Sequence, residues 1–249
     1  MIDRATRHAE EVISGKTVSG ELHQLSCQRH LNDLARQGTK EFPYLWKPEK
    51  SEEILEFAET LTIAEGMSPK PVQLFDNQCF DLGVPMGWVK QNGYRRFRRS
   101  YESMARQNGK SFKNGIRGPY IALASGYHYG KLFTAATKKR QARIAWEEMM
   151  KFIRSDPELA ELFKIQEYKS LITCYDTNCT IEALSKEGGL DDGFRGIFNS
   201  VDEVLSTINR VKSVKAKSKI DFLEIFIYNS HRGENLWLLI AEFIGLETL

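Results

Sequence analysis

The chain has 249 residues, of which 41% are hydrophobic and 27% are charged, a composition that excludes a long disordered segment. No stretch approaches the roughly 18 apolar residues of a membrane span, and residues 1–11 carry too many charges for a secretory signal, so we expect a globular, cytoplasmic protein without a membrane anchor. The net charge is only +2, so any contact with nucleic acid must come from local patches.

The first third of the chain reads as helices separated by turns that contain glycine. Apolar residues recur at helical spacing in three segments: 4–13, 21–37 and 52–64. In the second segment they form a stripe that we interpret as core: Leu22, Leu25, Leu31 and Leu34. We therefore expect a helical segment over residues 1–66, followed by a core domain over residues 67–249.

The pattern changes after Pro71. A helix is predicted over 72–82, and a loop or hairpin over 83–93. Strands and helices then alternate: strand 98–104, helix 110–125, strand 132–135 and helix 138–153. This alternation predicts an α/β fold in which crossover helices flank a mainly parallel sheet.

Shorter elements follow. The run Ser155-Asp156-Pro157-Glu158 has the form of a capping box and predicts a short helix that ends near Phe163. Strands are predicted over three segments: 170–174, 180–184 and 196–201. The last of them leads directly into Asp202 and Glu203.

The four cysteines, Cys27, Cys79, Cys174 and Cys179, are too few and too scattered for a disulfide scaffold. Cys174 and Cys179 could be two zinc ligands, but no second pair of Cys or His stands at metal-binding spacing. We favour reduced, half-buried strand residues.

Residues 104–111, Met-Ala-Arg-Gln-Asn-Gly-Lys-Ser, stand between a predicted strand and a predicted helix. A phosphate loop needs backbone N–H groups directed at the phosphates, a lysine for the β and γ oxygens, and a hydroxyl for magnesium. Gly109, Lys110 and Ser111 meet this requirement, whereas Met104 replaces the usual first glycine. A Gly-Lys-Ser tripeptide also occurs by chance, so an ordinary helix start is the alternative.

A second motif is the acidic pair Asp202-Glu203 at the end of a predicted strand. One carboxylate there can hold magnesium through water, and its neighbour can polarise the attacking water. Such a pair is commonly solvated surface. Because strands and helices alternate between this pair and Lys110, the two motifs support each other.

The loop Arg106-Gln107-Asn108-Gly109-Lys110-Ser111 resembles the deviant Walker A loop of tailed-phage terminase large subunits, in which arginine and glutamine precede a glycine-lysine pair. The resemblance covers about residues 4–203. Further segments that look like this family are 9–16, 27–31, 94–98, 135–143 and 190–193.

This resemblance implies a P-loop NTPase of the RecA-like class that uses ATP and Mg²⁺. It implies hydrolysis coupled to the packaging of viral double-stranded DNA. The implied partners are that DNA, a terminase small subunit and a portal protein, and the implied full-length assembly is a homo-oligomeric ring in the bacterial host cell.

The resemblance also implies roles for the loop residues. Lys110 would neutralise phosphate charge, Ser111 would ligate magnesium, and Arg106 would face the γ-phosphate. Gln107, Asn108 and Gly109 would complete the ATP-binding loop.

The resemblance implies roles for three further residues. Asp202 would be the Walker B acid and Glu203 the catalytic glutamate that orients water. Gln78 resembles a glutamine that the family uses near adenine, although Asn77 stands where an aromatic residue is common.

Two basic clusters leave alternatives open. Lys138, Lys139 and Arg140 could contact DNA phosphates or be solvated. The arginines at 95, 96, 98 and 99 flank Tyr94 and Phe97, which is compatible with nucleic-acid binding. We favour a solvated strand entry for this second cluster.

The sequence departs from the family pattern at two places. Glu102 would lie in the interior of a central strand, where apolar residues are expected. After Glu203 we find neither a Thr-Thr-Ala-Gly-like coupling motif nor a nuclease domain, so the core is expected to be incomplete after residue 203, with no nuclease activity.

We hypothesise that the tail is read in a shifted frame and that the chain is a truncated or frameshifted prophage copy, in which truncation could abolish ATPase activity. One permitted set of codons for residues 227–233, read one base later, encodes Ser-Thr-Thr-Ala-Thr-Ala-Gly. The alternatives are a helicase-like P-loop ATPase and a non-catalytic remnant that binds DNA or a partner subunit.

Overall fold

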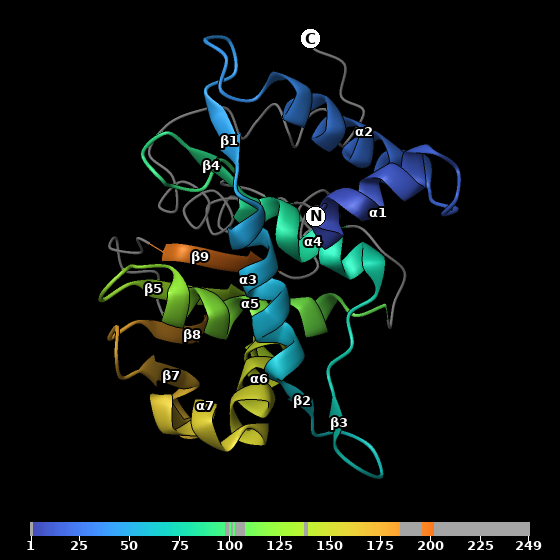
Figure 1. The fold of residues 1–249 in the computed structure, drawn as a ribbon. Coiled ribbons are helices and arrows are strands. Elements are labelled where there is room, and N and C mark those ends of the chain that lie inside the picture. Colours follow the sequence, from blue (N-terminus) through green and yellow to red (C-terminus); the bar gives the residue numbers. More distant parts are fainter. Residues whose placement is uncertain are drawn as a thin grey trace, which may run out of the picture.

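The computed structural model describes residues 2–97, 100, 102, 108–136, 139–184 and 196–201. The predicted α/β class is confirmed, because helices pack around a five-stranded sheet (Figure 1). In chain order the elements are α1 (Arg4–Ile13), α2 (Glu21–Arg36), β1 (Tyr44–Trp46), α3 (Pro48–Thr60), β2 (Thr62–Ile63), β3 (Lys70–Pro71), α4 (Asp76–Gly87), β4 (Trp88–Lys90), α5 (Lys110–Ala124), β5 (Lys131–Ala135), α6 (Lys139–Ser155), α7 (Pro157–Leu162), β6 (Phe163–Gln166), η1 (Glu167–Lys169), β7 (Leu171–Cys174), β8 (Thr180–Leu184) and β9 (Gly196–Val201).

The sheet has the strand order β6-β7-β8-β5-β9. Strand β5 lies between β8 and β9 and pairs in parallel with both, whereas β6, β7 and β8 are joined antiparallel. The antiparallel pairing has a local cause, since a tight turn connects β7 to β8 and leaves no length for a crossover helix. The parallel part of the sheet is therefore confined, in the described residues, to β8, β5 and β9.

Helix α4 differs most from prediction. It begins at Asp76 and continues to Gly87, through residues predicted as a loop or hairpin. The glycines mark close packing rather than a turn: a Cβ atom at Gly83 would lie 2.3 Å from the Ser51 hydroxyl, and one at Gly87 would lie 2.4 Å from the Trp46 ring. Proline is tolerated at residue 85 because the carbonyl it leaves without a helical partner, that of Asp81, accepts a hydrogen bond from Arg117 at 2.8 Å.

Other boundaries shift for local reasons. Helix α3 begins at Pro48, because proline is preorganised for the first helical position, and it ends at Thr60. The cap of α7 is Asp156, whose carboxylate accepts from the Leu159 N–H at 2.9 Å. Ser155 instead donates to the Thr62 carbonyl at 2.6 Å, so the predicted capping box is wrong in its first residue.

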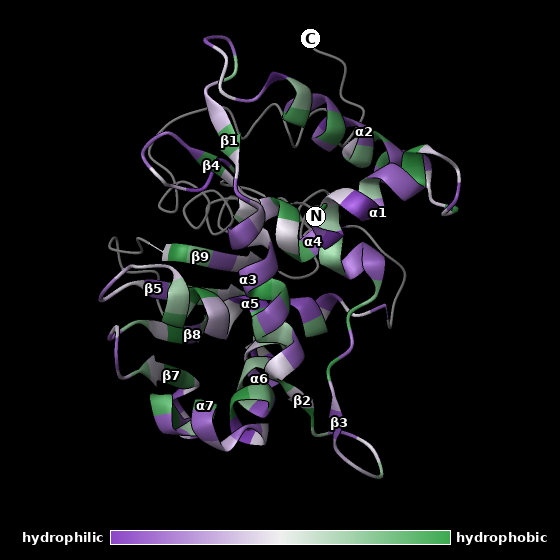
Figure 2. Cartoon of the chain, viewed as in Figure 1, coloured by the Kyte–Doolittle hydropathy of each residue, from purple (hydrophilic) through white to green (hydrophobic). Residues whose placement is uncertain are grey.

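Two apolar clusters form the core of the described residues. The larger joins α3, α4, α5, α6 and the sheet, and it includes Ile54, Leu82, Ile116 and Trp146. The smaller joins α1, α2, α4 and the antiparallel pair β1–β4 around Phe80 and Trp88. In Figure 2, hydrophobic and hydrophilic residues alternate along α1 and α2, the pattern of helices buried on one face.

The predicted leucine stripe of α2 is only partly core. Leu31 and Leu34 pack against the smaller cluster, but Leu22 and Leu25 are 76% and 59% exposed. Among the helices that the structure describes, none combines the length and apolar character needed to cross a bilayer.

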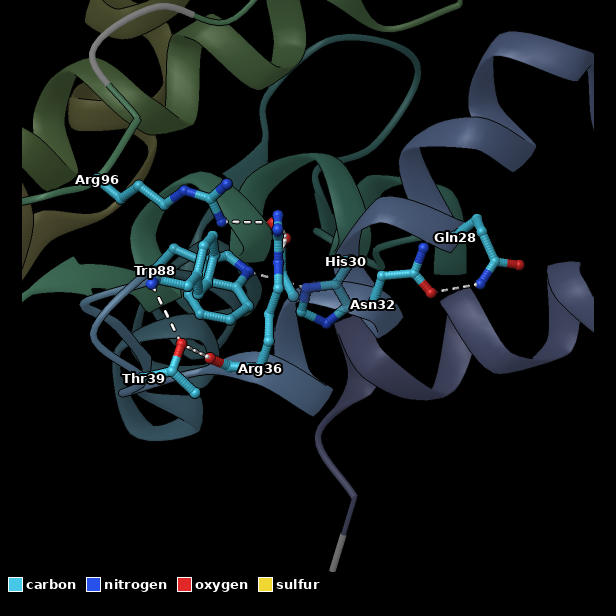
Figure 3. Close-up of polar contacts among 9 residues, drawn as sticks. Gln28, His30, Asn32, Arg36, Thr39, Trp88 and Arg96 are labelled. Atoms are coloured by element: carbon cyan, nitrogen blue, oxygen red, sulfur yellow. Dashed lines mark hydrogen bonds and ion pairs between the residues drawn. The ribbon is translucent and has the colours of Figure 1, made fainter.

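A chain of polar contacts holds the smaller cluster together, and Figure 3 shows the contact between Trp88 and His30. The Trp88 indole N–H donates to His30 Nδ1 at 3.0 Å, and His30 Nε2 lies 3.1 Å from the Thr6 hydroxyl. The Thr6 hydroxyl and the Trp46 indole N–H both donate to the Asp3 carboxylate, at 2.7 and 3.0 Å. These contacts assign the Nε2–H tautomer to His30, with Nδ1 as the acceptor.

Candidate functional site

The candidate phosphate loop ends at the first turn of α5. Gly109 precedes the helix with φ 82° and ψ 20°, the left-handed conformation that side-chain-bearing residues rarely adopt. Its carbonyl accepts from the Lys113 N–H at 3.0 Å, which closes the first turn. Gly109 has no side chain that could cap this helix start, and the first turn holds no acidic residue, so the N–H groups and the helix dipole favour an anion. Lys110 and Ser111 are half-buried in the same turn.

Gln78 comes from α4 and lies beside this loop. Its Oε1 accepts from the Phe75 N–H at 3.0 Å, which fixes the side chain. Its Nε2 lies 3.2 Å from the position that a Cβ atom on Gly109 would occupy. Glycine at 109 is thus required twice, by its backbone conformation and by the close approach of Gln78.

A buried ionic cluster attaches α5 to α4 and to residue 102. Lys113 is fully buried and pairs with Glu102 at 2.7 Å and with Asp81 of α4. Arg117, one turn later on α5, also pairs with Glu102. The cluster therefore joins residue 102 to the helix after the candidate loop and to the helix that carries Gln78.

The cluster also explains why the sequence places a carboxylate at residue 102. Burial alone would raise the pKa of Glu102, but Arg117 and Lys113 outweigh burial and hold its pKa below the usual range. Glu102 is thus ionised and paired. Of the predicted strand 98–104, only Ser100 and Glu102 are described, and neither belongs to a strand.

The direction of α5 follows from contacts at its far end. The Thr177 hydroxyl, just before β8, donates to the Ala122 carbonyl at 2.8 Å, so the end of α5 lies at the amino edge of the parallel strands. Helix α5 runs back along the sheet, and its beginning lies toward the opposite edge (Figure 1). At that carboxyl edge Ala135 of β5 pairs with Val201, the last residue of β9.

The structure thus describes five of the nine predicted site residues: Gln78, Asn108, Gly109, Lys110 and Ser111. Four are consecutive, and folding adds Gln78 to them across 31 positions of sequence. The other four predicted residues, Arg106, Gln107, Asp202 and Glu203, lie outside the described residues, as does the tail from 204 to 249.

The basic cluster at Tyr94 is not a solvated strand entry in its described part. Arg96 pairs with the buried Asp33 at 2.6 Å and stacks on the rings of Phe42 and Trp88. Arg95 donates to the Ile197 carbonyl of β9 at 3.1 Å. Arg98, Arg99 and Lys138 lie outside the described residues, and Arg140 is exposed at the start of α6.

The cysteines are free and buried. Cys174 and Cys179 flank the β7–β8 turn, joined by a backbone hydrogen bond of 2.9 Å, and no described metal-ligating group gathers around them. They are buried more fully than predicted.

Sequence reasoning missed Asp81, Lys113 and Arg117. A signal was present: Lys113 and Arg117 stand three residues before and one residue after Ile116, on the helical face that also carries the buried Tyr120. Two cations on an apolar face predict buried acidic partners.

Comparison with known proteins identifies the family. The terminase large subunit ATPase domain matches residues 76–228, more than half of the chain, and the match continues beyond Glu203. No curated protein sequence matches significantly. Among solved structures, the large terminase of bacteriophage HK97 matches with a TM-score of 0.59 and 20% identity over 75% of this chain.

The match covers 36% of the HK97 chain, so this chain corresponds to little more than a third of that protein. At this identity the likeness concerns the fold, and it confirms the predicted RecA-like α/β class. The chain belongs to the family of terminase large subunit ATPase domains.

Proposed function

We propose that the chain binds ATP with Mg²⁺ at the start of α5 and hydrolyses it, as the motor part of a terminase large subunit. The observation that carries the proposal is the helix start itself. Gly109 is left-handed and has no side chain to cap the helix, the first turn holds no acidic residue, and Lys110 and Ser111 occupy the positions that a phosphate loop requires.

The surrounding geometry supports a nucleotide at this helix start. Gln78 is fixed beside Gly109 by its bond to the Phe75 N–H, with its amide nitrogen on the loop side, where it could contact the base or the loop backbone. The carboxyl ends of β5 and β9 lie at the sheet edge toward which α5 begins. Asp202 and Glu203 directly follow β9 in the sequence.

The residues have chemistry that suits Mg²⁺, whose preferred ligands are oxygens. The Ser111 hydroxyl and the Asp202 carboxylate would hold the ion, which when bound would neutralise phosphate charge. Lys110 would bind the phosphate oxygens, and Glu203 would orient the attacking water by accepting its proton in a hydrogen bond. Arg106 would supply a second permanent positive charge at the γ-phosphate.

We also propose, on the basis of family membership, that the energy of ATP hydrolysis drives the packaging of viral double-stranded DNA in the bacterial host cell. The partners would be the DNA, a small terminase subunit and a portal protein. The chain would act within a ring of large subunits. Residues 1–66 would form a helical lead-in to the ATPase core of residues 67–249.

The decisive experiment measures ATP turnover of the full chain before and after Lys110→Ala. We expect the substitution to lower turnover at least a hundredfold, since it removes charge stabilisation at the reacting phosphate. Lys40→Ala, at an exposed lysine in the loop after α2, is the matched control and should leave the rate unchanged.

A second variant separates binding from hydrolysis. Glu203→Gln should retain ATP binding, measured with a fluorescent ATP analogue, while turnover falls. Equal background rates for the wild type and Lys110→Ala would overturn the proposed ATPase, and a non-catalytic role in binding DNA or a partner subunit would then be the better interpretation.

A further inference from the structure

Helices α1 and α2 bring together three side chains that commonly bind transition metals. His8 projects from α1, while His23 and Cys27 stand four residues apart, one turn of α2, and so share a helical face. The ligand atoms of the three residues all lie within 4.8 Å of one another. Among the described residues this is the one such group of His, Cys, Asp and Glu side chains.

Ordinary hydrogen bonding leaves this group incompletely satisfied. The Nε2 atoms of His8 and His23 face each other at 2.9 Å, so one of the two must carry a proton for a bond to exist. The other ring nitrogen of His8, Nδ1, is buried with no partner among the described residues, and the residue is only 3% exposed. Buried polar atoms are rarely left unpaired, so the bond between the two Nε2 atoms does not fully satisfy the His8 ring.

The spacing is close to what a tetrahedral ion needs. Zinc–nitrogen bonds of about 2.0–2.1 Å place two imidazole nitrogens roughly 3.3 Å apart, so the rings would separate by only a few tenths of an ångström. Thiolate and imidazole together select zinc over magnesium or calcium. This site would therefore not compete for the Mg²⁺ that accompanies ATP.

The fourth coordination position has access to solvent. His8 and His23 line an open cavity of about 460 Å³, whose other walls are the residues after α1 and the start of α4. Asp76, the first residue of α4, lies on this cavity. A water molecule from this cavity can complete four ligands, whereas the Asp76 carboxylate stands outside the group.

We propose that His8, His23 and Cys27 form a zinc site that links α1 to α2 at the edge of the smaller core cluster. On binding, the Cys27 thiol releases its proton to solvent and the imidazoles bind in their neutral forms. The ion would tie together α1 and α2, which pack against each other. The proposal does not depend on ATP hydrolysis.

The test uses the full chain, stripped of metal with a chelator and titrated with Zn²⁺ against a chromogenic chelator. We expect one equivalent to bind per chain and to raise the melting temperature. Co²⁺ as a spectroscopic substitute should produce a thiolate-to-metal charge-transfer band. Cys27→Ser should abolish the band, and His23→Ala should weaken Zn²⁺ binding by roughly a hundredfold or more, since even outer-shell changes cost 10–100-fold.

Cys79→Ser is the matched control, because Cys79 is also buried but stands outside the group. It should keep the band and the affinity. Lys110→Ala should keep Zn²⁺ binding even where ATP turnover is lost, so the two proposals fail separately. If Cys27→Ser does not fold, the Zn²⁺ affinity of His23→Ala tests the proposal instead, because His23 is partly exposed. No charge-transfer band in the wild type, or Zn²⁺ affinity unchanged in His23→Ala, would overturn the site.

Discussion

At the scale of single residues, His30 shows how burial sets a protonation state. Its ring lies between Trp88 and Thr6, accepting at Nδ1 and donating at Nε2. Burial lowers the pKa of His30 to about 4, with neighbouring Arg29 and Arg96 acting in the same direction. The neutral ring is therefore the folded form, and a second proton would leave the Trp88 N–H facing a donor.

This predicts a loss of stability in mild acid. Between pH 6.5 and about 4 the unfolded chain protonates His30 while the folded chain does not, so the free energy of unfolding falls as pH falls through that window. At about 1.4 kcal/mol per pKa unit the loss approaches roughly 3 kcal/mol. Urea titrations at several pH values measure it.

The matched variants for this prediction are His30→Gln and His128→Gln. Glutamine can accept from Trp88 and donate to Thr6 without titrating, so His30→Gln should flatten the pH dependence. His128 is exposed, and its replacement should leave the slope unchanged. A slope that is equal in wild type and His30→Gln would contradict the assignment.

Glu102 is the second decisive residue at this scale. Glu102→Gln removes the charge that Arg117 and the fully buried Lys113 share, so we expect the free energy of unfolding to drop by roughly 3 kcal/mol at pH 7. The control is Glu147→Gln in the half-exposed pair with Arg143, which should cost under about 0.5 kcal/mol. Chemical denaturation of both variants compares a buried network with a surface pair.

At the scale of elements, α4 combines features that usually break helices. Gly83 lets α4 approach α3 and α1, and Arg117 supplies the donor that Pro85 lacks. These features are stable only because neighbouring helices complete them. The helix also presents Phe80 and Val84 to the smaller cluster and Leu82 and Met86 to the larger one.

The packing at Gly83 predicts that Gly83→Ala destabilises the fold and that Ser51→Ala compensates for the loss. Gly83→Ala places a methyl group 2.3 Å from the Ser51 hydroxyl and should destabilise the fold by about 1–3 kcal/mol. The Ser51 hydroxyl is buried without a partner, so Ser51→Ala alone should be near neutral. In the double variant much of the loss should be recovered, although Ala5 remains 3.3 Å away. Additive losses in a double-mutant cycle would contradict this account.

At the scale of the whole molecule, the two clusters share α4 and should unfold together. The proposed helical lead-in, residues 1–66, supplies α3 to the larger cluster as well as α1 and α2 to the smaller one. We therefore expect no separate unfolding of the N-terminal helices.

Native-state hydrogen exchange tests this coupling. Phe80→Ala removes a buried ring from the smaller cluster and should cost about 3 kcal/mol. Amides of Val12 in α1 and of Ile121 in α5 should then both exchange roughly a hundredfold faster. Ile181→Val, in the larger cluster, should reciprocally accelerate exchange in α1. Acceleration confined to α1 and α2 after Phe80→Ala would show two independent units.

The sequence by itself determined whatever depends on neighbours along the chain. Helix α1, helix α5 and strands β8 and β9 were predictable nearly to the residue, because apolar periodicity and capping signals act within a turn or two. The Gly109-Lys110-Ser111 motif could likewise be recognised from the sequence, because a phosphate loop is built from consecutive residues. The α/β class followed from the alternation of these elements.

Only the tertiary structure decided what depends on residues far apart in the chain. From the sequence, Gly83 and Pro85 predict a loop. In the structure they belong to a helix, because Ser51 packs against Gly83 and Arg117 bonds the carbonyl that Pro85 leaves without a helical partner. No pattern in the sequence predicts that Gln78 lies beside Gly109, or that His8 lies beside His23 and Cys27. These contacts arise from helix packing. Packing brings side chains together in space whatever their separation along the chain, so it leaves no regular spacing in the sequence.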